Sequence, residues 1–227
     1  MNSRPIIQDQ RLDRNAVESL SDQTCGVELV NCDLDGVDFS DLSLVNWQFR
    51  DCHFKQTRFN GARLEDASFS GCRGAYANFM GADLAEASFE SSDFNNSSFI
   101  GASLSGAAFR DCKLTGADLT ETKSLSTSFT ATLLTNARLT GFNFRKDVID
   151  RVDFGNADLV RCDFREATFK QSSLKDANLT DCRFDGADLR GADLGGIRLN
   201  DARRFKGATI SRDQASQLLA ELGLKVR

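Results

Sequence analysis

The sequence predicts an all-β solenoid followed by a short C-terminal α-helix, and two patterns carry this prediction. A large apolar residue recurs at every fifth position, and a small residue recurs two positions before it. Neither a helix of 3.6 residues per turn nor a strand with alternating faces produces a period of five. A chain that repeats one short unit without interruption instead forms stacked coils, each packed on its neighbours.

The large residues begin at Leu29 and end at Leu199, with no insertion or deletion between them. Of these 35 positions, 16 are Phe, 16 are Leu and one is Ile149. Only Gly74 and Ser124 break the series, and 16 of the 18 Phe in the chain belong to it. We therefore expect the Phe and Leu side chains to form columns along the interior of the solenoid.

The small residues two positions earlier comprise 14 Ala, 6 Cys, 7 Ser or Thr and 3 Val, and the exceptions are Leu42, Trp47, Phe142, Asp147 and Ile197. A small side chain beside a large one allows successive coils to interdigitate. Gly, Asp and Asn are common two residues after each large position, and these residues favour turns. The remaining polar positions are therefore expected to face solvent and to turn the chain.

Ala-Asp-Leu at residues 82–84, 117–119 and 187–189 matches the A(D/N)LXX signature of the pentapeptide-repeat family. The sequence resembles this family over about residues 27–201. The resemblance implies a right-handed quadrilateral β-helix with four pentapeptides per coil. With 35 units, this gives about nine coils and a rod roughly 40 Å long at about 4.8 Å per coil.

The two ends of the chain depart from the repeat. We expect residues 1–28 to form an N-terminal cap, residues 29–201 the β-helix, and residues 202–227 a C-terminal helix and dimerisation segment. Ser211 to Gln214 has the S-x-x-Q pattern of a helix capping box. Apolar residues at 215, 218, 219 and 222 then follow a helical stripe, and Gly223 fits the position after the helix.

The C-terminal residues 214–219 and 222–224, with residues 12–15 near the start, resemble Qnr-type quinolone-resistance proteins. This resemblance implies a two-fold homodimer through the C-terminal helix, with an interface built from Ile210, Ala215, Leu218, Leu219, Leu222, Leu224 and Val226. It also implies a rod that imitates DNA, binds DNA gyrase or topoisomerase IV and protects it from quinolones or natural poisons. Many Qnr proteins carry projecting loops, whereas no loop interrupts residues 29–201 here.

The charge of the chain is compatible with binding to a basic protein surface. The net charge is −5, and residues 29–201 carry 19 basic and 26 acidic groups, a net charge of −7. Candidate residues of a partner-binding acidic surface are Asp118, Asp153, Asp158 and Asp163. Stacked positions such as 118, 138 and 158 nevertheless carry both negative and positive side chains. The alternative is a structural or scaffolding protein that binds another protein partner.

Enzymatic and cofactor-dependent functions are disfavoured. His53 is the one histidine, and the sequence lacks the P-loop, nucleophile-elbow and zincin motifs. We expect no catalytic, cofactor or metal site, no direct nucleic-acid contact and no small-molecule substrate. No apolar run reaches the ~20 residues of a membrane span, and the first ten residues lack the apolar core of a signal peptide. These features predict a cytoplasmic protein without a membrane anchor.

Six of the seven cysteines occupy the small inward positions: Cys32, Cys52, Cys72, Cys112, Cys162 and Cys182. A coil of 20 residues would stack several of them, which leaves open a metal or redox ladder. We favour the alternative, in which Cys replaces Ala or Ser as a small buried side chain. The sequence has no C-x-x-C spacing, so we expect free thiols.

Three places disturb the repeat. Gly74 and Ser124 leave holes in the large columns, and we expect Leu125 to fill the second one. From Phe142 to Val152, Phe142 and Asp147 stand where small residues belong and Val148 stands where a polar residue does. This segment is interpreted as a local kink, with a binding feature on the rod as the alternative.

Overall fold

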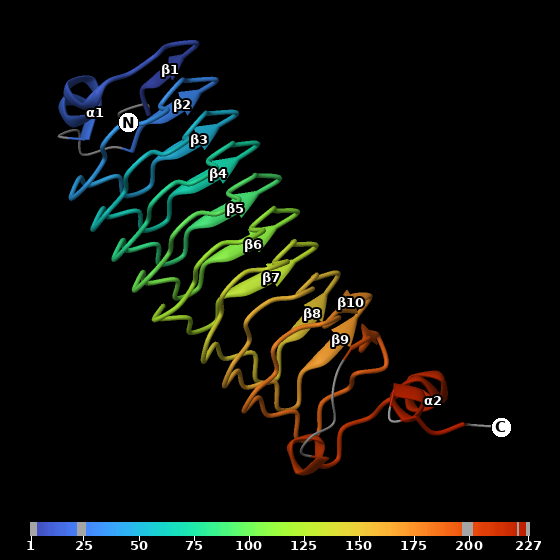
Figure 1. Cartoon of the computed structure of the whole chain (residues 1–227). Helices are drawn as coiled ribbons and strands as arrows, with labels where there is room; N and C mark the ends of the chain where they lie inside the picture. The colour runs from blue at the N-terminus through green and yellow to red at the C-terminus, as the bar shows by residue number, and fades with distance from the viewer. Residues whose placement is uncertain (1–3, 22–25, 197–201, 222, 226–227) are drawn as a thin grey trace.

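A computed structural model describes residues 4–21, 26–196, 202–221 and 223–225 of the chain. These residues form a β-solenoid of about nine turns, stacked from the N-terminal to the C-terminal end (Figure 1). Positions 20 residues apart lie over one another, as in the parallel pairing of Phe49 with Phe69 and of Phe69 with Phe89. The all-β solenoid and the C-terminal helix are therefore confirmed.

One face of the solenoid is a continuous parallel sheet of nine three-residue strands in sequence order. They are β1 (Ile6–Gln8), β2 (Glu28–Val30), β3 (Gln48–Arg50), β4 (Ser68–Ser70), β5 (Ser88–Glu90), β6 (Ala108–Arg110), β7 (Ser128–Thr130), β8 (Val148–Asp150) and β9 (Thr168–Lys170). A second, two-stranded sheet joins β10 (Ser172–Ser173) to β11 (Ala192–Asp193). Single β-bridges hold the other faces, such as Asp118 with Arg138.

Tight turns separate the five-residue units, and their backbone is left-handed. The predicted turn positions have positive φ, as at Gly116 (70°) and Asn136 (58°). Glycine, Asn and Asp reach this region most readily. The same conformation is imposed on Tyr76 (62°) and Arg161 (62°), which shows that the coil geometry overrides residue preference there.

The large residues form the predicted interior columns. Phe59, Phe79 and Phe99 stack with centroids 4.7 and 4.8 Å apart and nearly parallel rings. Rings of neighbouring columns meet edge to face, as Phe69 meets Phe79 at 90°. Burial of each such side chain contributes on the order of 1.5–3 kcal/mol, so the columns are the main source of stability.

The hole at Gly74 is filled from the next turn. A Cβ atom built on Gly74 would lie 2.2 Å from Cε1 of Phe94, so the Phe94 ring occupies the space. Its centroid is 6.4 Å from that of Phe54, two turns away. Two regular coil spacings would separate them by about 9.6 Å. Phe94 therefore leans across the turn that contains Gly74.

The hole at Ser124 is not filled by Leu125, and that expectation was wrong. Leu125 is 71% exposed and faces solvent. Phe142, from the following turn, is buried instead, with its ring 4.8 Å from Phe144 and 5.6 Å from Phe129. A Leu at position 125 follows the inward position rather than occupying it, so the coil geometry directs it outward.

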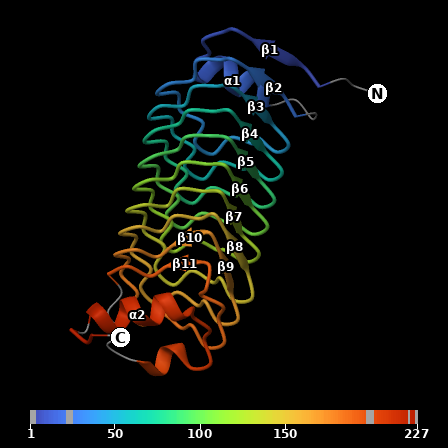
Figure 2. The ribbon, with the colours of Figure 1, turned by 90° about the vertical axis from the view of Figure 1, so that its right-hand side faces the viewer.

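Both ends of the solenoid are covered (Figure 2). At the N-terminus, β1 pairs with β2 at an offset of 22 residues, and helix α1 (Arg14–Ser21) lies within that longer turn. Leu12 and Val17 are buried there. At the C-terminus, a 3-10 helix η1 (Ala202–Phe205) places Phe205 on Phe184 at 4.9 Å. Helix α2 (Arg212–Glu221) then lies against the last turns.

No helix in the described part of the chain is long and apolar enough to cross a bilayer.

Candidate functional site

The outward middle position of each five-residue unit forms ladders along the rod. Asp118, Arg138 and Asp158 are consecutive in one ladder. Arg138 Nη1 donates to Asp118 Oδ2 at 2.8 Å, so the two carboxylates flank a cation. This ladder therefore mixes signs, as its residues predicted.

The other two candidate carboxylates lie on different ladders. Asp163 is bridged to Asn143 and Arg183, and Asp153 is bridged to Leu133 and Ser173. The four residues proposed for an acidic surface, Asp118, Asp153, Asp158 and Asp163, are thus spread over three ladders and do not form one continuous patch. Each of them would contribute separately to the potential of the rod.

These aspartates also have a structural role that the A(D/N)LXX signature does not reveal. In all four, Oδ1 accepts a hydrogen bond from the backbone N–H two residues later, at 2.8 Å for Asp153 and 3.3 Å for Asp158. This is an Asx turn, in which a short carboxylate stabilises a tight bend. The Asp of the repeat signature is therefore explained by turn formation, without any requirement for a partner.

Local hydrogen bonds lower the pKa of two surface carboxyl groups, those of Asp163 and Asp38. The Arg165 side chain lowers the pKa of Asp163 below its usual value. Hydrogen bonds from the Ser40 side chain and backbone lower the pKa of Asp38 to about 2. Such groups are charged at neutral pH and are unsuited to act as general acids.

Asp147 has the opposite environment. It occupies an inward position, and burial raises the pKa of its carboxyl group. That carboxyl group has no hydrogen-bond or ion-pair partner among the described residues.

The six cysteines of the repeat are buried, as predicted. Their sulfur atoms contact backbone carbonyls, such as Cys162 Sγ with Leu139 O at 3.0 Å. Burial raises the pKa of Cys52 to about 12 and that of Cys112 to about 11. Protonated thiols are poor nucleophiles and poor metal ligands.

Across the described ranges, no group of three His, Cys, Asp or Glu residues is arranged to hold a metal ion. Cys25 lies outside the described residues.

Gln214 has a second role that was not predicted from the sequence, because it also docks helix α2 on the solenoid. The predicted capping box is present, because Ser211 Oγ accepts from Gln214 N–H at 3.1 Å and Gln214 Oε1 accepts from Ser211 N–H at 2.7 Å. Gln214 Nε2 also donates to the carbonyls of Leu189 and Ala192, both at 2.7 Å. A Gln in an S-x-x-Q box signals the cap, but only the fold shows that its amide reaches the last turn.

The residues predicted to form a dimer interface divide into two groups. Leu218 is 6% exposed and belongs to the apolar core of its own chain. Ile210, Leu219 and Leu224 are exposed, and Leu224 is 56% accessible. Ala215 is partly buried, and Leu222 and Val226 lie outside the described residues. The exposed apolar surface at this end of the described chain therefore comes from the outer side of α2 and its flanks.

Comparison with known proteins identifies the repeat. The family model described as a pentapeptide repeat region matches residues 25–99, and the model of eight pentapeptide repeats matches 127–165, 149–186 and 162–201. The chain belongs to the pentapeptide-repeat family. Proteins of this family are generally non-catalytic. No curated protein matches this pentapeptide-repeat protein at a significant level.

Solved structures share the fold of this pentapeptide-repeat protein at low identity. QnrB1, a plasmid-mediated fluoroquinolone resistance protein, matches in a trypsin-treated variant form with a TM-score of 0.67 and 22% identity, over 99% of this chain and 98% of that one. Full-length QnrB1 matches with a TM-score of 0.61 and 22% identity, over 97% and 98%. HetL from the cyanobacterium Nostoc, involved in heterocyst differentiation regulation, has a TM-score of 0.61 and 22% identity, over 89% and 84%.

Proposed function

We propose that this pentapeptide-repeat protein binds a type II topoisomerase, DNA gyrase or topoisomerase IV, as a non-enzymatic DNA mimic. It protects the enzyme from quinolones or natural gyrase poisons, and it acts as a homodimer joined through α2. The observation that carries the proposal is the end-to-end similarity to QnrB1, which includes both terminal segments and spans 99% of this chain.

The charge of the rod supports this choice of partner. The net charge of −7 over residues 29–201 attracts a basic, DNA-binding protein surface. A dimer doubles both the length and the charge of the rod. Since the attraction acts between solvated surfaces, binding should weaken as ionic strength rises.

A second candidate is a scaffold for a different protein partner. The mixed-sign ladder of Asp118, Arg138 and Asp158 favours it, because a DNA-like surface would carry one sign. The comparable similarity to HetL, whose described role is in the regulation of differentiation, also supports a regulatory protein–protein contact.

A supercoiling assay with purified gyrase separates the two candidates. DNA mimicry predicts that micromolar protein restores supercoiling in the presence of a quinolone, or inhibits supercoiling when in excess. Raising the salt concentration should reduce both effects. The absence of any effect with gyrase and with topoisomerase IV, with or without drug, would favour the scaffold.

The dimer is tested by light scattering, which should give twice the chain mass of 25.0 kDa. Leu219→Asp combined with Leu224→Asp places two charges on the exposed apolar surface and should give the monomer. Gln217→Glu adds a charge at an exposed polar position of the same helix and should leave the dimer intact. A monomeric wild-type protein would remove the dimeric arrangement from the proposal.

A further inference from the structure

Backbone hydrogen bonding between successive turns is interrupted at one place in the described residues. Elsewhere the pattern is regular, as in Ser128 N–H to Ala107 O and Thr168 N–H to Asp147 O, both 2.9 Å. Between residues 121–127 and 140–148, no backbone hydrogen bond is formed. Strands β7 and β8 pair only at Thr130 and Asp150, whereas β8 and β9 pair at three positions. The two turns therefore separate on one side and remain joined on the other.

The residues of the two turns explain the separation. Ser124 removes a large side chain from one turn, and Phe142 places a ring where the next turn normally has a small residue. The buried Phe142 ring lies beside Phe129 and Phe144 and keeps the turns from closing. Thr122 and Ser124, which point inward by register, are partly exposed as a result.

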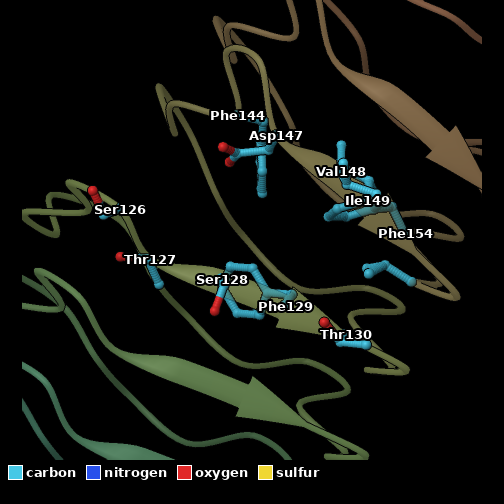
Figure 3. A pocket seen from close by; sticks show the side chains of 11 residues that line it. Ser126, Thr127, Ser128, Phe129, Thr130, Phe144, Asp147, Val148, Ile149 and Phe154 are labelled. Carbon is cyan, nitrogen blue, oxygen red and sulfur yellow. The ribbon is translucent and has the colours of Figure 1, made fainter.

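A cavity of about 260 Å³ opens where β7 and β8 diverge (Figure 3). Its apolar lining includes Phe129, Phe144 and Ile149, from both turns. Its polar lining includes Asp147 and Thr127. A dry cavity of about 150 Å³ is large enough to hold benzene. The space between these turns therefore accommodates one aromatic or branched apolar group together with a short polar arm.

The polar lining contains the hydroxyl groups of Ser126, Ser128 and Thr130, and its charged group is the carboxylate of Asp147. The Asp147 carboxylate has no partner among the described side chains, although the residue is partly buried. In regular turns the carbonyl equivalent to Thr127 O accepts the N–H of the following strand, but Val148 N–H does not reach it here. A carboxylate and a carbonyl beside aromatic rings form a suitable environment for a protonated amine.

We propose that this inter-turn cavity binds a small organic cation, a protonated primary amine carried on a compact aromatic or branched apolar body. The ammonium group pairs with Asp147 and donates to Thr127 O. The apolar body lies against Phe129, Phe144 and Ile149. The assignment is independent of topoisomerase binding, because it rests on the cavity alone.

The experiment uses the full-length protein and 2-phenylethylamine at pH 7, followed by calorimetry and by chemical-shift changes of Phe and Ile resonances. Saturable binding in the millimolar range or tighter is expected. The uncharged 2-phenylethanol should bind at least tenfold more weakly, and the anionic 3-phenylpropionate should not bind. Equal affinity for the amine and the alcohol would overturn the role of the carboxylate.

Two variants separate charge from shape. Asp147→Asn should weaken amine binding at least tenfold, whereas Asp150→Asn, three residues away on β8, should not change it. Ser124→Leu combined with Phe142→Ala restores the repeat at those two positions, should close the cavity and should abolish binding in a folded protein. Undiminished binding by the folded double variant would place the amine elsewhere and refute the proposal.

Butylamine identifies the kind of ligand, because it reproduces the side chain of lysine. It should bind more weakly than 2-phenylethylamine, since it covers less of the aromatic lining. Equal or tighter binding of butylamine would show that the cavity takes a lysine side chain rather than a ring-bearing amine, and would overturn the assignment of a free aromatic or branched ligand.

Discussion

Gly74 and Phe94 show how one residue can compensate for a neighbour that departs from the repeat. The ring of Phe94 enters the space that a large residue at position 74 would fill, and it approaches Phe54 from two turns away. The glycine is therefore required by close packing, because a Cβ atom would overlap the ring. A substitution toward the consensus of the family would be harmful at this position.

Gly74→Leu should lower the free energy of unfolding by about 1–3 kcal/mol, because it forces two large side chains into one space. Urea unfolding followed by circular dichroism measures the change. The matched variant Phe94→Leu combined with Gly74→Leu gives one Leu to each of the two turns and should recover most of the loss. If Gly74→Leu alone stabilised the protein, the described position of the Phe94 ring would be incorrect.

Asp147 and Asp38 should affect stability in opposite directions as pH changes. Burial raises the pKa of Asp147, so its neutral form stabilises the fold below pH 3.8 and that contribution is lost as pH rises. Asp147→Asn should therefore stabilise the protein at pH 7, with the gain vanishing toward pH 3.8. The pKa of Asp38 is lowered to about 2. Asp38→Asn should be destabilising above pH 3.8, and its effect should fade toward pH 2.

The measurement for this pair is the urea midpoint of each variant and of the wild type between pH 3 and pH 8. A constant difference across that range for either variant would mean that its carboxyl group titrates alike in the folded and unfolded chains.

At the scale of elements, the amide of Gln214 and the side chain of Leu218 both hold α2 to the solenoid. Gln214 Nε2 bonds two carbonyls of the last turns, and Leu218 enters the core. The carbonyls at the end of a solenoid have no further coil to bond. Gln214 thus supplies part of the hydrogen bonding that another turn would provide.

Gln214→Glu should detach α2 from the last turns. A carboxylate cannot donate to the carbonyls of Leu189 and Ala192, and each unsatisfied buried acceptor costs about 1–3 kcal/mol. Hydrogen exchange should show faster exchange in residues 212–221 and at the end of the solenoid, with the N-terminal turns unchanged. Ala220→Gln, at an exposed position of the same helix, is the control. Unchanged exchange in Gln214→Glu would show that Leu218 alone holds the helix.

Much of this fold was predictable from the sequence, and the exceptions share one physical cause. A strict period of five determines which side chains point inward, so the columns, the positions of the turns and the buried cysteines followed from it. The period does not determine how a ring packs where a neighbouring turn departs from the repeat. The positions of Phe94 and Phe142 therefore needed coordinates, as did the cavity beside Asp147. The inward direction of Leu218 was ambiguous because a helix stripe can face its own chain or a partner.

At the scale of the whole molecule, the described part of the rod is least cohesive between residues 121–127 and 140–148. Each regular junction is joined by backbone hydrogen bonds on every face, and this junction lacks them on one side. In a solenoid, stability is nearly a sum of turns and junctions. The junction therefore divides the rod into two blocks that are coupled more weakly than their internal turns.

Amide hydrogen exchange should locate this junction. Ser126 and Val148 lack the inter-turn bonds that Gly106 and Ser128 make one turn earlier. We expect the first pair to exchange roughly tenfold faster or more than the second pair under native conditions. The comparison is internal, because each amide is matched to the same position of the preceding turn. Equal protection at all four positions would contradict the interruption.

The constant 20-residue register from Glu28 to Asp188 has a consequence for how the rod can change in length. Deleting one complete circuit, such as residues 82–101, would shorten the rod by about 4.8 Å and leave α1 and α2 facing as before. Deleting a single pentapeptide would instead rotate one end against the other by a quarter of a circuit. The length of the rod can thus be changed in steps of one whole winding while the relative orientation of its two ends stays the same.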